Sequence, residues 1–127
     1  MCVLLADDQA EVRSALRLLL EQEANLTVAG EAGNAGELLA RALDASPDIV
    51  MLDWELPGLQ PTSRMPAAIP QFGVIAALRV ACPRIKVIVL SGRPEARQQA
   101  LDAGADAFAS KGDPPEKLLE TIRAVGE

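Results

Sequence analysis

The sequence predicts an α/β domain in which a single five-stranded parallel sheet is doubly wound, with helices on both faces. Short apolar runs alternate five times with segments of helical periodicity, which is the pattern of successive βα units. The third run is apolar on both faces, as a central parallel strand should be. The chain has 127 residues, the size of one domain, and shows no linker, internal repeat or low-complexity segment. We therefore expect one domain over residues 1–127.

The first half of the chain follows this pattern regularly. Strands are predicted at residues 3–6, 26–30 and 48–52. The helix after the first strand has a core-facing stripe at Val12, Ala15, Leu16, Leu19 and Leu20. Asp8 and Glu11 have the spacing of a capping box at the start of that helix. The helix after the second strand is predicted from the apolar positions Leu38, Leu39, Ala42 and Leu43.

The second half contains two further strands, predicted at residues 85–90 and 105–109. Helices are predicted at residues 74–81 and 94–103, the latter stopped by Gly104. The last helix opens at Pro114 and Pro115, because the first turn of a helix tolerates proline. Residues 60–73 contain prolines that cannot continue a regular helix, so this stretch is predicted to be an irregular insertion.

Composition excludes several classes of function. The chain has no histidine, which removes histidine-based triads and histidine-ligated metal sites. Its net charge of −6 argues against direct binding of nucleic acid through a basic face. The start of the chain lacks the cationic segment of a signal peptide, and no apolar run approaches the ~18–20 residues of a membrane span. We expect a soluble, cytoplasmic protein without a membrane partner, whose Cys2 and Cys82 are reduced thiols.

Polar residues follow four of the five predicted strands. Asp7 and Asp8 follow the first, Asp53 the third, Ser91 the fourth, and Lys111 comes just after the fifth. Each of them alone has an ordinary structural explanation, such as a helix cap, a turn or a solvated surface residue. Because ligands bind at the carboxyl ends of the strands in such sheets, their joint placement predicts one site.

The residue types at this site suggest phosphoryl chemistry. Three adjacent carboxylates raise each other's pKa unless a cation neutralises them, and Mg²⁺ binds such oxygen ligands. A carboxylate can also be the nucleophile toward a phosphoryl group. That reaction needs mainly positioning and charge neutralisation, which Mg²⁺ and Lys111 would supply, while Ser91 could hydrogen-bond a phosphoryl oxygen.

These motifs together closely resemble the receiver domain of two-component response regulators. The matching segments are residues 5–8, 48–58, 87–92 and 103–111, and the likeness covers the chain apart from residues near 60–73. The resemblance implies a flavodoxin-like fold with strand order 2-1-3-4-5. Residues 115–124 look most like the branch that is often fused to helix-turn-helix output domains.

The resemblance also implies a role for each site residue. Asp53 would be the phosphoacceptor, and the metal, Mg²⁺ or Mn²⁺, would be bound by Asp8, Asp53 and the backbone carbonyl of Glu55, with Asp7 acting through water. Ser91 would move toward the phosphoryl group and Lys111 would pair with it. Phe108 falls at the aromatic switch position, although it could also be a plain aromatic residue at the edge of the core.

The function implied is a signalling switch rather than an enzyme acting on a separate substrate. A histidine kinase would phosphorylate Asp53 in a metal-dependent reaction, the group would later be lost by hydrolysis, and the changed surface would control an output. That output is expected to be a downstream protein or a fused domain absent from this chain, and a homodimer on activation is possible. The chain would be either a stand-alone receiver or part of a longer protein.

Two alternatives and two departures accompany this interpretation. A receiver-like interaction module could work without phosphorylation, and a haloacid-dehalogenase-like phosphatase would use similar aspartyl chemistry. The latter is disfavoured because it needs Asp-x-Asp, whereas Asp7 and Asp8 are adjacent. Glu55 adds a carboxylate two residues after Asp53, where it could repel anions or orient water. The insertion at 60–73 is either a surface elaboration or a segment that contacts a partner.

Overall fold

The computed structural model describes residues 1–56 and 71–126, which form five strands and five helices in alternation. In chain order these are β1 (Cys2–Ala6), α1 (Ala10–Glu21), β2 (Thr27–Ala32), α2 (Ala35–Ala45), β3 (Ile49–Asp53), α3 (Gln71–Ala81), β4 (Lys86–Ser91), α4 (Ala96–Asp102), β5 (Ala107–Ser110) and α5 (Pro115–Gly126). The strands form one parallel sheet in the order β2-β1-β3-β4-β5. The predicted fold class and strand order are therefore confirmed.

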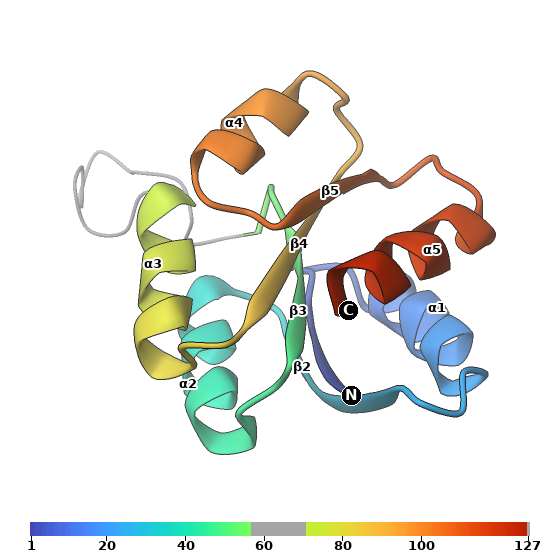
Figure 1. Ribbon diagram of the computed structural model, residues 1–127, viewed down its shortest axis with the longest axis horizontal. Helices are drawn as coiled ribbons and strands as arrows, with labels where there is room; N and C mark the ends of the chain where they lie inside the picture. Colours follow the sequence, from blue (N-terminus) through green and yellow to red (C-terminus); the bar gives the residue numbers. More distant parts are fainter. Residues whose placement is uncertain (57–70, 127) are drawn as a thin grey trace.

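The helices cover both faces of the sheet, and each face has its own core (Figure 1). Residues of α2, α3 and α4 pack on one face, against side chains such as Leu4, Val50 and Val87. Residues of α1 and α5 pack on the other, against Leu5 and Met51 among others. Each strand contributes to both cores because successive side chains point to opposite faces. Burial on both sides explains why the central strands are continuously apolar in sequence.

The register of the sheet brings the carboxyl ends of four strands together. Ala6 at the end of β1 pairs with Leu52, directly before Asp53. Asp53 pairs with Leu90, and Ser91 pairs with Ser110. The polar residues that follow these strands therefore meet along one edge of the sheet, where α/β sheets of this kind bind their ligands.

At the opposite ends of the strands, a charged clamp formed by Arg79 and Asp106 connects α3 to β4 and β5. Arg79 on α3 forms an ion pair with Asp106 at 3.0 Å and also donates to the backbone carbonyls of Ile85 and Gly104. The same Asp106 oxygen accepts the backbone N–H of Val87 at 2.7 Å. Gly104 has φ = 106°, a conformation that glycine adopts more readily than other residues. This glycine ends α4 as predicted and leads the chain into β5.

The structure corrects two predictions about helix starts. The predicted capping box is wrong, because α1 begins one residue later, with Gln9 at its N-cap and no side-chain cap hydrogen bond. The predicted insertion over 60–73 is too long at its end, because residues 71–73 already belong to α3. The rest of the insertion lies outside the described residues.

Two predicted apolar stripes are also less buried than expected. Of the α1 stripe only Leu20 is buried, and Ala15 is exposed. In α2 the buried face runs through Ala35, Leu38 and Ala42, so Leu43 faces away from the core and is 65% exposed. None of the helices in the described parts of the chain is long and apolar enough to cross a membrane.

Candidate functional site

Three carboxylates gather at the carboxyl edge of the sheet. One oxygen each of Asp7, Asp8 and Asp53 lies within 4.8 Å of the other two. Asp7 and Asp53 are only 1% and 2% exposed, whereas Asp8 is exposed to solvent. The cluster arises because β1 and β3 are neighbours in the sheet and the three residues come at or just after their ends. The sequence prediction that these residues meet is confirmed.

Lys111 supplies the positive charge of the site. Its Nζ lies 3.1 Å from Asp7 Oδ2 and 3.2 Å from Asp53 Oδ1. The residue directly follows β5, two strands away from Asp53, and its backbone N–H is bonded to the carbonyl of Ser91 at 2.9 Å. That bond fixes the start of the side chain so that the ammonium reaches across β4 to the acidic cluster.

The charges at the site shift the pKa values of its members. The pKa of Asp53 is raised from 3.8 to about 6. Burial is the largest cause and the nearby Glu55 and Asp7 carboxylates act in the same direction, whereas the Glu55 backbone N–H and Lys111 act in the opposite direction. Although desolvation opposes it, the contacts with Asp7 and Asp53 raise the pKa of Lys111. The site thus holds more negative charge than one lysine neutralises.

The donor set fits a hard divalent cation. Carboxylate oxygens are the ligands that Mg²⁺ takes, with water completing its shell. Asp7 Oδ2 is buried and accepts no hydrogen bond from the described residues, so that the Lys111 ammonium is its charge partner. A buried carboxylate oxygen that shares one ammonium with a second carboxylate, within a cluster of three, is the kind of position that a further cation stabilises. Asp8 and Asp53 could hold such an ion directly, and Asp7 through water.

Ser91 and Glu55 form a second, connected part of the site. Ser91 is fully buried, and its Oγ donates to Glu55 Oε1 at 2.8 Å and accepts from the backbone N–H of Arg93 at 3.0 Å. Arg93 Nε bonds to the same Glu55 oxygen at 3.0 Å. Although partial desolvation opposes it, hydrogen bonds with Ser91, Asp53 and Arg93 lower the pKa of Glu55.

Sequence reasoning missed Arg93, although a signal for it was present. Glu55 lies two residues after Asp53 at the end of β3, and Arg93 lies two residues after Ser91 at the end of β4. Equal offsets from the ends of neighbouring strands place the two side chains close together. Opposite charges at these positions therefore predict an ion pair, and the structure contains it.

Two aromatic residues connect the site to the rest of the molecule. Trp54, directly after Asp53, is fully buried and donates from Nε1 to Gln99 Oε1 on α4 at 3.2 Å. Phe108 lies in β5, half-buried, and packs against the core shared by α2, α3 and α4. Its side chain belongs to the edge of that core, and its role as a switch stays a prediction.

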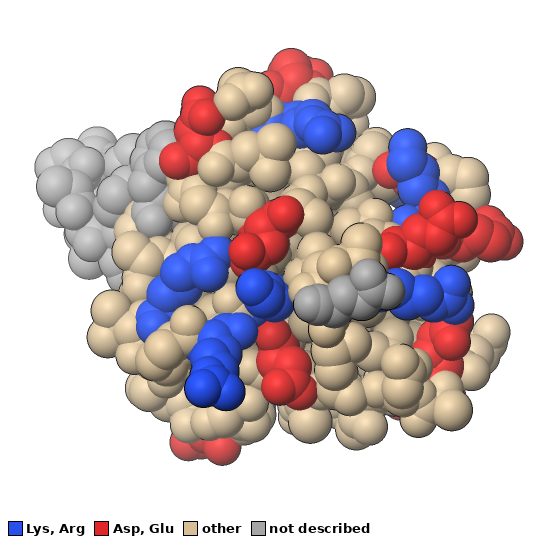
Figure 2. All heavy atoms as spheres, in the orientation of Figure 1, with Lys and Arg blue, Asp and Glu red and all other residues tan. Residues whose placement is uncertain are grey.

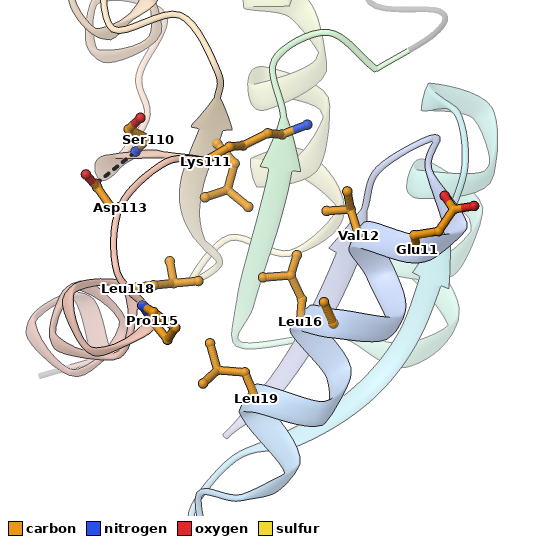
Figure 3. A pocket seen from close by; sticks show the side chains of 11 residues that line it. Glu11, Val12, Leu16, Leu19, Ser110, Lys111, Asp113, Pro115 and Leu118 are labelled. Atoms are coloured by element: carbon orange, nitrogen blue, oxygen red, sulfur yellow. Dashed lines mark hydrogen bonds between the residues drawn. The ribbon is translucent and has the colours of Figure 1, made fainter.

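An apolar groove between α1 and α5 lies beside the acidic cluster. Its volume is about 420 Å³, and its walls include Val12, Leu16 and Leu19 from α1 and Leu118 from α5. Figure 3 shows these side chains facing one another, with Lys111 extending past them toward the end of β3. The groove explains the half-exposed stripe of α1. Lys111 lines both the groove and the acidic site, and the groups suited to a phosphoryl group lie on the side of the site.

Surface charge is mixed rather than basic. On the face seen in Figure 2, Lys and Arg side chains lie among Asp and Glu side chains. Charged side chains of the described residues also pair across elements, as in the ion pair of Arg123 on α5 with Glu23 at 3.1 Å. The same holds between α1 and β2, where Arg13 and Arg17 both contact Glu31.

The family model for the response regulator receiver domain matches residues 3–123. The chain belongs to this family. Among its relatives are the uncharacterized transcriptional regulatory protein YxjL of Bacillus subtilis, 31% identical over 96% of this chain and 52% of that protein, and the transcriptional activator protein ExaE of Pseudomonas putida, 34% identical over 98% and 55%. The nitrate/nitrite response regulator protein NarL of Escherichia coli is 29% identical over 98% of this chain and 55% of its own length.

This receiver domain spans about half the length of the curated relatives it matches. Solved structures of response regulators share the fold. A DNA-binding response regulator of the LuxR family from Staphylococcus aureus superposes with a TM-score of 0.81 at 26% identity, over 99% of this chain and 98% of that one. The signal receiver domain of the putative response regulator NarL from Mycobacterium tuberculosis, 24% identical with a TM-score of 0.81, shares the fold over 98% of this chain and 94% of that one. The domain thus shares its fold with these receiver domains.

Proposed function

We propose that this receiver domain is a phosphorylation switch whose acceptor is Asp53. The observation that carries the proposal is the position of Lys111, whose ammonium lies within about 3 Å of both Asp7 and Asp53 at the end of the central strand. A lysine so placed can pair with a phosphoryl group on Asp53 without leaving the site. The buried hydroxyl of Ser91 and the acidic cluster complete the set of groups that such a switch needs.

The proposed reaction transfers a phosphoryl group from a histidine of the kinase to Asp53. A carboxylate oxygen of Asp53 attacks the phosphorus of a phosphohistidine on a histidine kinase, the P–N bond breaks, and the imidazole leaves with a proton. Lys111 neutralises charge on the phosphoryl oxygens, since its ammonium is already held beside Asp53. Later attack by water on phosphorus returns the carboxylate. Asp53 is thus phosphorylated and later dephosphorylated, and the domain does not turn over a separate substrate.

The metal belongs to the same proposal. Asp8 and Asp53 would hold Mg²⁺ or Mn²⁺ directly together with the backbone carbonyl of Glu55, and Asp7 would act through water. When bound, the ion would neutralise the phosphoryl oxygens and the excess of carboxylate charge. Lys111 would then be released from part of its pairing with the cluster and become free to follow the phosphoryl group.

The output is expected to lie outside the described domain. Two relatives of about twice its length carry names of transcriptional regulators, so a fused or separate regulatory partner is the output that we propose. Phosphorylation would change the surface formed by α4, β5 and α5, where Phe108 lies, and a homodimer on activation is one possible result.

Intact mass spectrometry tests the proposed function. The domain is incubated with acetyl phosphate with and without Mg²⁺, and Asp53→Asn is treated in parallel. We expect a gain of one phosphoryl group that requires the metal and is lost in the variant. A wild-type protein that gains nothing from acetyl phosphate or from a phosphorylated histidine kinase, while binding a partner that also binds Asp53→Asn, would favour an interaction module that works without phosphorylation.

A further inference from the structure

The Ser91 hydroxyl is fully engaged in this structure. It donates to Glu55 Oε1 at 2.8 Å and accepts from the backbone N–H of Arg93 at 3.0 Å. A serine hydroxyl carries one proton and can donate it to one strong acceptor at a time. While Glu55 holds that proton, Ser91 cannot donate to a phosphoryl oxygen on Asp53.

Glu55 offers Ser91 the same kind of acceptor that a phosphoryl group would offer. Its carboxylate is an anionic oxygen acceptor at the end of β3, and its backbone N–H donates to Asp53 Oδ1 at 3.1 Å. The same carboxylate oxygen, Oε1, accepts from Ser91 Oγ at 2.8 Å and from Arg93 Nε at 3.0 Å. The hydroxyl of Ser91 is therefore already bonded to an anionic oxygen, that of Glu55, which lies two residues from the acceptor Asp53.

Arg93 holds Glu55 in this position. Its Nε bonds to the same Oε1 that accepts from Ser91, so one oxygen receives two donors from the end of β4 and the loop after it. The Arg93 and Glu55 side chains are 52% and 37% exposed, and ion pairs so exposed to water are weak. The backbone carbonyl of Arg93 accepts the N–H of Ala96 at the start of α4. The arrangement therefore ties the two loops together but can be opened at low cost.

From this geometry we infer that Glu55 is a positioning residue of the switch, whose carboxylate competes with the phosphoryl group for Ser91 Oγ. Glu55 keeps the hydroxyl in its unphosphorylated arrangement until a tetrahedral oxyanion on Asp53 displaces it. In that exchange one O–H···O hydrogen bond to Glu55 is replaced by one to the phosphoryl oxygen, and no covalent bond of either residue changes. The inference rests on the proposed function, since it requires an anion on Asp53.

Beryllofluoride, a tetrahedral mimic of the phosphoryl group, provides the test. It is titrated in the presence of Mg²⁺ into the whole domain, and binding is followed by the fluorescence of Trp54, the single tryptophan of the chain, buried next to Asp53. Glu55→Ala should bind about tenfold more tightly than wild type, which corresponds to about 1.4 kcal/mol. Glu55→Gln keeps an acceptor oxygen without the charge and should gain less. Glu95→Ala, the same change at an exposed residue before α4, should leave binding unchanged.

A double-mutant cycle separates competition from charge repulsion. In Ser91→Ala there is no hydroxyl to release, so adding Glu55→Ala should improve binding far less than it does in the wild type. An equal improvement in both backgrounds would mean that Glu55 acts by repulsion alone and would overturn the inference. If the wild type binds beryllofluoride through Asp53 but Glu55→Ala binds it no more tightly, the inference is also overturned. If neither the wild type nor Glu55→Ala binds, the proposed function itself fails.

Discussion

At the scale of single residues, the behaviour of Lys111 decides how the site works. Its ammonium is the cation that the described structure places among the buried carboxylates Asp7 and Asp53. It therefore both neutralises these carboxylates at rest and can pair with a phosphoryl group in the phosphorylated state. Removing the ammonium should therefore have opposite effects on the binding of metal and on the rate of phosphorylation.

Lys111→Met should weaken phosphorylation while sparing the binding of metal. Without the ammonium the acidic cluster attracts Mg²⁺ more strongly, so we expect metal affinity to be unchanged or higher, by up to about tenfold. The rate of phosphorylation by acetyl phosphate should fall by at least about a hundredfold, because an interaction with the transferring oxygens is lost. Calorimetry with Mg²⁺ and mass spectrometry against time measure the two effects. A variant with weaker metal binding and unchanged phosphorylation would contradict these roles.

The raised pKa of Asp53 gives the metal-free domain a defined pH dependence. This pKa is raised from 3.8 to about 6, mainly by burial, so between these values the folded protein binds a proton that the unfolded chain has lost. The free energy of unfolding therefore falls as the pH rises through this window. Because an asparagine side chain cannot ionise, Asp53→Asn should be more stable than wild type at neutral pH by on the order of 2 kcal/mol, and this advantage should disappear below pH about 4.

Urea unfolding with a chelator present, at about pH 4 and about pH 7.5, measures this difference. Glu95→Gln serves as the control, because it removes the same charge from an exposed position. Equal stability of the wild type and Asp53→Asn at both pH values would mean that folding does not raise the pKa of Asp53.

At the scale of elements, the two edges of the sheet have different tasks. The carboxyl edge concentrates negative charge that Lys111 neutralises only in part, whereas the other edge is closed by the clamp of Arg79 and Asp106 between α3, β4 and β5. A clamp of this kind fixes the far ends of the strands, so that rearrangement is confined to the loops at the site. Trp54 and Arg93 link those loops to α4, the helix that we expect to respond.

Asp106→Ala should destabilise the domain without abolishing phosphorylation. The substitution leaves the Val87 N–H and the Arg79 guanidinium without their shared acceptor, which typically costs about 1–3 kcal/mol. Chemical denaturation measures the cost, and Asp102→Ala on the exposed side of α4 is the matched control, with an expected effect within about 0.5 kcal/mol. Equal effects of the two substitutions would show that the clamp contributes little.

Sequence patterns predicted the elements better than their ends and faces. The alternation of apolar runs was sufficient for the sheet, because parallel strands buried on both sides need such runs. The cap at Asp8 was mispredicted because this carboxylate lies in the acidic cluster beside Asp7 and Asp53, and α1 starts at Ala10 instead. Leu43 is one of the apolar positions that predict α2, yet it is exposed, because the face of α2 that meets the sheet is set by tertiary packing.

The site was predictable in part for a similar reason. Residues at strand ends are brought together by topology alone, so Asp7, Asp53, Ser91 and Lys111 could be placed from sequence. The hydrogen bond of Ser91 to Glu55 could not, since it depends on the path of two loops.

At the scale of the whole molecule, charge connects folding to metal binding. The chain carries a net charge of −6, and part of the negative charge is buried at one edge of the sheet. Binding of Mg²⁺ to the folded state alone should stabilise it. At ten times its dissociation constant, Mg²⁺ contributes about 1.4 kcal/mol, or about 5 °C in Tm for a domain of this size.

Thermal unfolding with and without Mg²⁺ checks this expectation. The shift should be absent in Asp8→Asn/Asp53→Asn, which loses two proposed ligands, and should persist in Asp102→Ala. A shift of the same size in the doubly substituted protein would place the metal elsewhere.

The most direct test of the central claim is to locate the phosphoryl group on the chain. The domain is phosphorylated with acetyl phosphate and Mg²⁺, reduced with borohydride to convert the acyl phosphate into an alcohol, and digested for peptide mass spectrometry. The account predicts that Asp53 is converted and that Asp7, Asp8 and Glu55 remain carboxylates. Conversion at another carboxylate, or conversion that persists in Asp53→Asn, would contradict it.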